Sequence, residues 1–128
     1  MIYIDTSVIL AELLAEDRHP APNFWRQELV SSRLIEYETW TRLHAKGLGP
    51  THGDAAEALL ASIAIVELSR SVLDRVRHPY PKPVRTLDAI HLASLEFLRE
   101  RGLRCPLATF DTRQRESAIA LGIEVQEP

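Results

Sequence analysis

The sequence predicts an α/β domain in which a short, mainly parallel sheet of four or five strands lies between two layers of helices. Short apolar segments alternate with helical segments along the chain, and no tight hairpin signal joins two consecutive strands. This alternation implies right-handed crossovers and a sheet that is covered on both faces. The length of 128 residues suits one domain spanning 1–128.

The first half of the chain contains apolar strand segments separated by helices with apolar stripes. Thr6 or Ser7 can cap the first helix and Asp54 the fourth, because their side-chain oxygens accept hydrogen bonds from free N–H groups of a first turn. Prolines and glycines separate the helices. In chain order we expect a strand over 2–5, helices over 6–16 and 22–30, a strand over 30–35, helices over 36–46 and 55–63, and a strand over 64–68.

The second half of the chain begins with a short helix over 70–77 that Ser69 can cap. The segment 78–83 contains three prolines and is expected to be a loop. Thr86 can then cap the most strongly patterned helix of the chain. The remaining expected elements are that helix over 87–101, a strand over 107–110, a helix over 113–121 and a strand over 123–125, with Gly102 and Gly122 ending the two helices.

The composition excludes several classes of protein. Charged residues make up 26% of the chain and hydrophobic residues 45%, as in globular domains rather than disordered chains. One cysteine, Cys105, allows neither an internal disulfide framework nor a zinc site with several thiolates. No apolar run approaches the roughly 20 residues of a membrane span, and no basic region precedes an apolar stretch at the start. We therefore expect no membrane association and a cytoplasmic location.

The charge is unevenly distributed. The net charge of −3 argues against a nucleic-acid partner, but residues 70–128 hold ten basic and eight acidic side chains. Thirteen of the 15 cationic residues are arginines, whose planar guanidinium suits bidentate contact with phosphate. The arginines of the second half therefore allow a local RNA contact, although solvated helix faces would explain them equally well.

Four carboxylates occupy comparable positions in the expected fold. Asp5 and Asp111 directly follow strands, whereas Glu38 and Asp88 lie in the first turns of helices. Because ligands of parallel α/β sheets bind outside the carboxyl ends of the strands, we expect the four to converge at one sheet edge. Taken singly, Asp5 and Asp111 could be helix caps, and Glu38 and Asp88 could favour the positive ends of their helices.

A carboxylate cluster favours a bound cation. Two carboxylates about 5 Å apart repel each other by about 3 kcal/mol at an effective dielectric of about 20. Such a cluster either raises the pKa of some members or binds a counter-ion. Ligands that are all hard oxygens favour Mg²⁺ or Mn²⁺, one or two ions per site, over Zn²⁺. This arrangement suits hydrolysis of phosphodiester bonds by a metal-activated water.

Four segments of the chain resemble the PIN-domain family, and more closely its VapC-type toxin branch. They are Ile-Tyr-Ile-Asp-Thr-Ser at 2–7, Tyr-Glu at 37–38 with Arg42 beyond, Arg-Thr-Leu-Asp-Ala-Ile-His-Leu-Ala at 85–93, and Ala-Thr-Phe-Asp-Thr-Arg at 108–113. The first segment is common, the block at 85–93 is much more specific, and the four occur in the order of the family. The resemblance runs through the whole chain and implies a PIN-like three-layer α/β/α domain.

The resemblance also implies an activity and the residues that carry it. It implies a Mg²⁺- or Mn²⁺-dependent endoribonuclease, usually a homodimer, that is the toxin of a VapBC-type pair and is neutralised by a VapB-type antitoxin. The catalytic, metal-binding quartet of the family falls on Asp5, Glu38, Asp88 and Asp111, with Thr6, Ser7 and Thr109 as supporting hydroxyls. Glu36 is a less favoured substitute for Glu38. Arg85, Arg113 and Arg115 are candidate RNA contacts.

Two other hypotheses remain beside the nuclease. A receiver-type phospho-acceptor domain would need a second acid after the first strand and a late lysine, but Thr6 follows Asp5 and no lysine lies beyond Lys82. A non-catalytic PIN-like binding module is disfavoured because all four acids are present. His91 lies on roughly the same helix face as Asp88, where it is either a satisfied buried histidine or a neighbour of the site.

Overall fold

Five short strands pair in parallel to form one sheet in the computed structural model, which describes residues 1–128. The strand order is β3-β2-β1-β4-β5, so the central strand β1 pairs with β2 on one side and β4 on the other. Tyr3 of β1 is in register with both Val30 and Leu107. The strands are β1 (Ile2–Ile4), β2 (Leu29–Ser32), β3 (Ala64–Val66), β4 (Leu107–Ala108) and β5 (Val125–Gln126).

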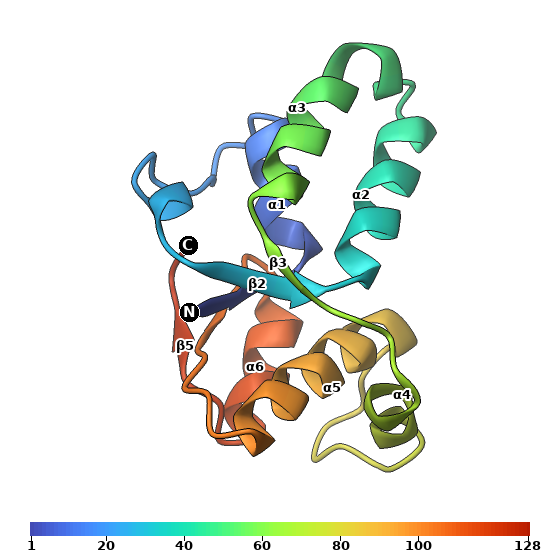
Figure 1. Cartoon of the computed structure of the whole chain (residues 1–128), viewed down its shortest axis with the longest axis vertical. Coiled ribbons are helices and arrows are strands. Elements are labelled where there is room, and N and C mark those ends of the chain that lie inside the picture. The colour runs from blue at the N-terminus through green and yellow to red at the C-terminus, as the bar shows by residue number, and fades with distance from the viewer.

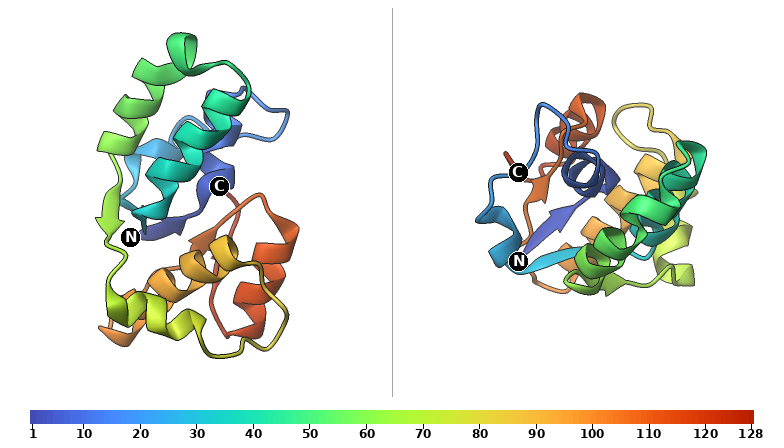
Figure 2. Two further views of the ribbon diagram at one scale, coloured as in Figure 1. Left: turned by 90° about the vertical axis from the view of Figure 1, so that its right-hand side faces the viewer. Right: turned by 90° about the horizontal axis from the view of Figure 1, so that it is seen from above.

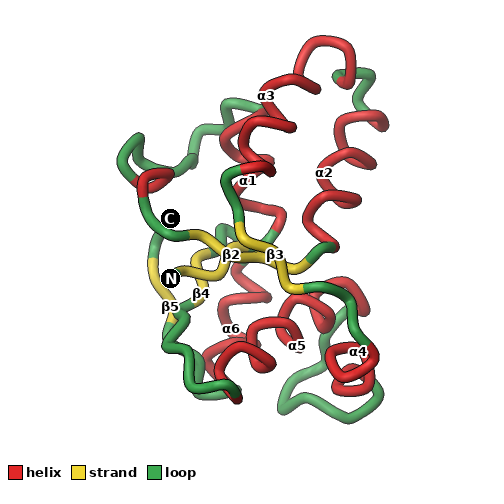
Figure 3. The backbone as a smooth tube through the Cα atoms, in the orientation of Figure 1, coloured by secondary structure: helices red, strands yellow, loops and turns green.

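Six α-helices form the two outer layers (Figure 1). Helices α1, α2 and α3 cover one face of the sheet, and α4, α5 and α6 cover the other; Figure 3 shows the strands between these layers. The pair α2 and α3 extends beyond the sheet (Figure 2). The helices are α1 (Thr6–Leu13), α2 (Leu34–Ala45), α3 (Gly49–Ala61), α4 (Arg70–Val76), α5 (Thr86–Glu100) and α6 (Thr112–Ala120). None of them is long and apolar enough to cross a membrane.

The alternation of side chains along β1 divides the core into two clusters. Ile2 and Ile4 pack with the apolar residues of α1–α3, whereas Tyr3 between them packs with those of α4–α6. Successive side chains of a strand point to opposite faces of its sheet, so a short apolar strand serves both layers. All three residues are buried. Burial on both faces explains why the strands read as continuous apolar runs.

The expected α/β class, the parallel sheet and most elements are confirmed, but the helix expected over 22–30 is wrong. Only a 3₁₀ turn forms there, over Phe24–Arg26, and Leu29 begins β2. Leu29 is 3% exposed, so its burial between the two layers outweighs its local helical preference. The strand ends at Ser32, whose hydroxyl accepts a hydrogen bond from the N–H of Leu34 at the start of α2.

The N-terminal starts or caps of three helices also differ from expectation. Helix α3 begins at Gly49 and not at 55, because Pro50 lies in its first turn, where a missing N–H costs nothing. Asp54 is therefore inside the helix and caps nothing. The cap of α1 is Asp5 rather than Thr6 or Ser7. Thr86 does not cap α5 as expected: it is the first residue of the helix, and Arg85 at the cap position makes no side-chain hydrogen bond there.

Candidate active site

The four acids of the expected quartet line one groove of about 800 Å³ at the carboxyl ends of the strands. They come from different parts of the chain, since Asp5 follows β1, Glu38 lies on α2, Asp88 lies in the first turn of α5 and Asp111 follows β4. The groove lies where the strand order reverses, beside β1 and β4, which is the usual ligand site of an open parallel sheet. Thr6, Ser7 and Arg85 line the same groove.

Asp5 is a buried carboxylate that is held by three hydrogen bonds. It is 5% exposed. Its Oδ1 accepts from the N–H of Ser7 at 3.1 Å and from the Ser7 hydroxyl at 2.5 Å, and its Oδ2 accepts from the Thr109 hydroxyl at 2.5 Å. Burial raises the pKa of Asp5, His91 and these hydroxyls oppose the shift, and the charge of Asp111 adds to it. The ionised form of Asp5 is therefore disfavoured by burial, and a nearby cation would stabilise it.

The hydroxyls of Ser7 and Thr109 also connect the ends of β1 and β4. Ser7 Oγ accepts from the N–H of Phe110 at 3.0 Å, and Thr109 Oγ1 accepts from the N–H of Asp111 at 3.0 Å. The two hydroxyl oxygens lie 3.2 Å apart. Each hydroxyl thus holds Asp5 and the backbone that leads to Asp111. This arrangement fits the supporting role that the resemblance implies for both residues.

Glu38 is held through a single oxygen. Its Oε1 accepts from the Thr6 hydroxyl at 2.6 Å and lies 2.6 Å from Nε2 of His91. Burial by itself raises the pKa of Glu38. The hydrogen bond from His91 and the positive charge that His91 carries when protonated, together with the Thr6 hydroxyl and the charge of Arg42, outweigh burial and bring the pKa below its usual value. Glu38 is therefore ionised at neutral pH.

Behind Glu38, His91 is 2% exposed and its Nδ1 lies 2.8 Å from the hydroxyl of Tyr3. Burial raises the pKa of Tyr3 well above its ordinary value, so the phenol keeps its proton. His91 is thus buried and also adjacent to the site, which combines the two roles that its sequence position left open. Its link to Glu38 spans 53 residues of sequence and has no local sequence signal.

Asp88 and Asp111 both line the groove, and the negative charge of Asp111 acts on the carboxyl of Asp88. No hydrogen bond to the carboxylate of Asp88 is present, and burial, followed by the charges of Asp111 and Asp5, raises its pKa. Asp111 caps α6, because its Oδ1 accepts from the N–H groups of Arg113 at 2.9 Å and Gln114 at 3.3 Å. Asp111 is therefore both a cap and a groove residue, and so is Asp5 at α1.

The donor set of the groove matches a hard divalent cation. As the structure stands, no three carboxylate, histidine or cysteine side chains converge tightly enough to hold an ion. Both oxygens of Asp88, Oδ2 of Asp111 and Oε2 of Glu38 accept no hydrogen bond from the protein and are open to an ion. Carboxylate oxygens without sulfur ligands favour Mg²⁺ or Mn²⁺.

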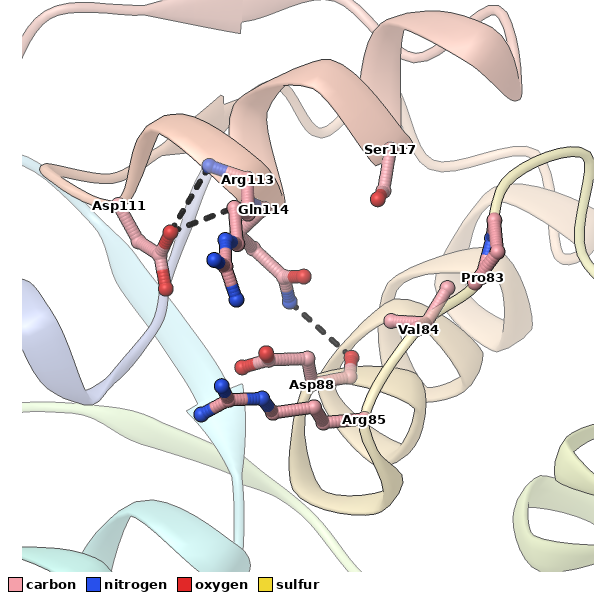
Figure 4. A pocket seen from close by; sticks show the side chains of 8 residues that line it. All are labelled: Pro83, Val84, Arg85, Asp88, Asp111, Arg113, Gln114 and Ser117. Carbon is pink, nitrogen blue, oxygen red and sulfur yellow. Dashed lines mark hydrogen bonds between the residues drawn. The ribbon is translucent and has the colours of Figure 1, made fainter.

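A smaller cavity of about 100 Å³ adjoins the groove and shares Arg85, Asp88 and Asp111 with it (Figure 4). Arg85 and Arg113 extend toward the two carboxylates there. Sequence reasoning missed Gln114, which is 1% exposed and donates from Nε2 to the backbone oxygen of Asp88 at 3.0 Å. No sequence pattern points to this contact, because it depends on how α6 packs against α5. The contact ties α6 to the first turn of α5.

Two expected candidates lie outside both cavities. Arg115 forms an ion pair with Glu127 at 3.2 Å. Glu36 pairs with Arg33 at 3.0 Å, and Arg33 also binds Glu67. The structure thus places Glu38 in the groove and Glu36 on the opposite side of the same turn, in a surface ion-pair cluster.

Comparison with known proteins agrees with this geometry. The family model of the PIN domain matches residues 2–120. Ribonuclease VapC46 of Mycobacterium tuberculosis is 34% identical over 131 residues, covering 99% of this chain and 97% of that protein. Ribonuclease VapC35 of the same species is 32% identical over 134 residues, covering 100% and 97%.

The fold has a match among solved structures. The crystal structure of VapC20 from Mycobacterium tuberculosis, described as a sarcin-ricin loop cleaving toxin, superposes with a TM-score of 0.69. The two sequences are 23% identical, and the match covers 100% of both chains. A strand-end groove with four carboxylates, the family match and the full-length relatives lead to one assignment: the chain belongs to the PIN-domain family, within its VapC branch.

Proposed function

We propose that this protein is a Mg²⁺- or Mn²⁺-dependent endoribonuclease and the toxin of a VapBC-type toxin–antitoxin pair. The observation that carries the proposal is the convergence of four carboxylates in one open groove, in a chain whose full-length relatives are named ribonucleases. Asp5, Glu38, Asp88 and Asp111 would hold one or two ions. A bound divalent ion supplies Lewis-acid stabilisation of phosphate oxygens and lowers the pKa of water for attack on phosphorus.

The other residues of the site hold the acids and the substrate. Ser7 and Thr109 keep the buried Asp5 carboxylate in one orientation. Arg85 and Arg113 border the carboxylates, where they would bind phosphate oxygens of the RNA backbone. Arg115 is a weaker candidate because Glu127 already neutralises it. The local positive charge of these arginines offsets the negative net charge of the chain for an RNA ligand.

Partners and location follow from the same proposal. A VapB-type antitoxin would neutralise the toxin, and two copies of the chain would form a homodimer. The RNA substrate places the activity in the cytoplasm. Light scattering of the purified toxin tests the dimer, because a monomer mass of 14.5 kDa is easily separated from twice that value.

The decisive experiment measures cleavage of total RNA by protein purified free of antitoxin, with Mg²⁺, with Mn²⁺ and with EDTA. The test variant is Asp88→Asn, and the matched control is Asp54→Asn, which changes an exposed aspartate on α3. We expect discrete fragments from wild type and Asp54→Asn, and none with EDTA or Asp88→Asn. Cleavage that persists in EDTA or in Asp88→Asn would refute the proposed site, and folded wild type inactive in both metals would refute the activity on these RNAs.

A further inference from the structure

A continuous chain of hydrogen bonds leads from the interior of the sheet to the groove. Tyr3 on β1 is fully buried, and its hydroxyl accepts from the N–H of Ser32 at 3.1 Å. The same hydroxyl lies 2.8 Å from Nδ1 of His91, and Nε2 of His91 lies 2.6 Å from Oε1 of Glu38. The chain therefore joins β2, β1, α5 and α2, and it ends on a groove carboxylate.

The donors and acceptors of this chain allow one consistent assignment for a neutral imidazole. An ionised carboxylate only accepts, so Nε2 of His91 carries the hydrogen that bonds to Glu38. The other ring nitrogen, Nδ1, is then an acceptor, and Tyr3 donates its hydroxyl hydrogen to it. The Tyr3 oxygen in turn accepts from the backbone of Ser32. Every group in the chain has a partner, as a buried polar network requires.

The chain leaves Glu38 with two unequal oxygens. Both donors, Thr6 and His91, bond to Oε1, and no hydrogen bond reaches Oε2. Two donors from different helices restrict rotation of the carboxylate. Asp111 shows the same division, because its Oδ1 accepts both capping N–H groups and its Oδ2 accepts none. In both Glu38 and Asp111, one oxygen is thus bound by the protein and the other is left for a ligand.

We infer that Tyr3 and His91 are positioning residues that act through Oε1 of Glu38, so that Glu38 presents Oε2 alone to the divalent cation. The inference rests on the proposed function, since it takes Glu38 as a metal ligand. Carboxylates that bind metals are usually held by hydrogen-bonding partners of this kind, and loss of such a partner typically lowers metal affinity about 10- to 100-fold. Tyr3 extends this control into the core, because its ring is buried among the apolar residues of α4–α6 and meets the His91 ring edge-on.

The test measures Mn²⁺ affinity of the metal-stripped protein by titration calorimetry. His91→Phe removes the donor to Glu38, His91→Gln keeps an amide N–H there, and Tyr3→Phe removes one hydroxyl from the buried end of the chain. The matched control is Tyr80→Phe. The Tyr80 hydroxyl donates at 3.1 Å to the backbone oxygen of Ala89, which lies on α5 as His91 does, and Tyr80 does not line the groove.

We expect His91→Phe to lower the affinity about 10- to 100-fold and Tyr3→Phe to lower it less, by about tenfold at most. His91→Gln should recover most of the loss, and Tyr80→Phe should bind Mn²⁺ as wild type does. A folded His91→Phe with wild-type affinity would overturn the inference. If that variant does not fold, Tyr3→Phe decides, because it retains the ring, and unchanged affinity there would equally overturn the role of Tyr3.

A second readout does not depend on metal. Nitrogen NMR of the neutral form of the His91 ring should show the Nε2–H tautomer in metal-free wild type, and Tyr3→Phe should shift the Nδ1 resonance of that form while Nε2 keeps its hydrogen. An Nδ1–H tautomer would contradict the assignment. Wild type that neither binds Mn²⁺ nor cleaves RNA would defeat the proposed function itself, whereas wild type that binds while His91→Phe binds equally defeats only this inference.

Discussion

Glu36 and Glu38 lie two residues apart on α2, yet their carboxylates reach different surroundings. Glu36 forms an ion pair with Arg33 at 3.0 Å, whereas Glu38 lines the groove and accepts hydrogen bonds from Thr6 and His91. Side chains two positions apart on a helix point in different directions, so the pair provides an internal control for the role of a carboxylate in the groove.

Replacing each of these acids by its amide should have unequal effects on RNA cleavage. We expect Glu38→Gln to lower kcat/KM by about 100-fold or more, because loss of a group that only supports a metal ligand already costs about 10- to 100-fold. Glu36→Gln should stay within about twofold of wild type, since exposed ion pairs contribute little. Equal losses in the two variants, measured on the same RNA, would contradict a special role of the groove carboxylate in cleavage.

Asp88→Asn should stabilise the metal-free protein. Burial and the charges of Asp111 and Asp5 disfavour the ionised Asp88, and no donor compensates it. After solvent screening the gain is about 1 kcal/mol or less, which raises Tm by roughly 2–5 °C in a domain of this size. Thermal unfolding in EDTA checks the shift, and a lower Tm would mean that the carboxylate supports the fold.

The pH dependence of that stability follows from the direction of the shift. A carboxyl whose pKa is raised in the folded state contributes stability at low pH and loses it as the pH rises through the folded pKa. The pKa values of Asp5 and Asp88 are both raised, so metal-free wild type should gain stability on lowering the pH from 7 toward about 4.5. Below that range, protonation of Glu38, whose pKa is lowered, opposes the gain.

The contrast between wild type and Asp88→Asn isolates this effect from other titrating groups. The Tm difference between them should shrink as the pH falls, because the wild-type carboxyl becomes neutral as the amide already is. Melting curves in EDTA at several pH values give the difference directly. A difference that stays constant from pH 4.5 to 7 would show that Asp88 does not change its charge in this range.

Divalent cations should stabilise the wild-type fold. Ligand binding to the native state adds RT ln(1 + [L]/Kd), or about 2.7 kcal/mol at 100 times Kd. Mg²⁺ or Mn²⁺ should therefore raise the Tm of wild type, EDTA should reverse the rise, and Asp88→Asn should lose most of it. An equal rise in the variant would indicate that the ions bind somewhere other than the groove.

Arg113 and Arg115 should differ in RNA binding. Arg113 borders the carboxylates, whereas Arg115 is paired with Glu127. In an Asp88→Asn background that prevents cleavage, Arg113→Gln should reduce the slope of log K against log salt by about 0.7–0.9, as expected for one lost phosphate contact. Arg115→Gln should leave the slope nearly unchanged. A larger change for Arg115→Gln would place the RNA path along the outer face of α6.

The sequence permitted a prediction of the site because strand ends are recognisable from local pattern. Asp5 and Asp111 follow apolar runs directly, and parallel topology then brings such positions to one edge. The link between His91 and Glu38 could not be predicted in this way, because it depends on how α5 packs beside α2. The helix expected over 22–30 failed for a related reason, since burial of Leu29 in the sheet depends on strands far away in sequence.

The position of Asp111 at the boundary of α6 has a consequence for how activity and shape are coupled. Asparagine caps a helix about as well as aspartate. In Asp111→Asn the amide oxygen would take over the capping bonds of Oδ1, and an NH₂ group would replace the oxygen left for a ligand. We therefore expect Asp111→Asn to keep its fold and to lose RNA cleavage, while any partner protein that recognises the fold would still bind it.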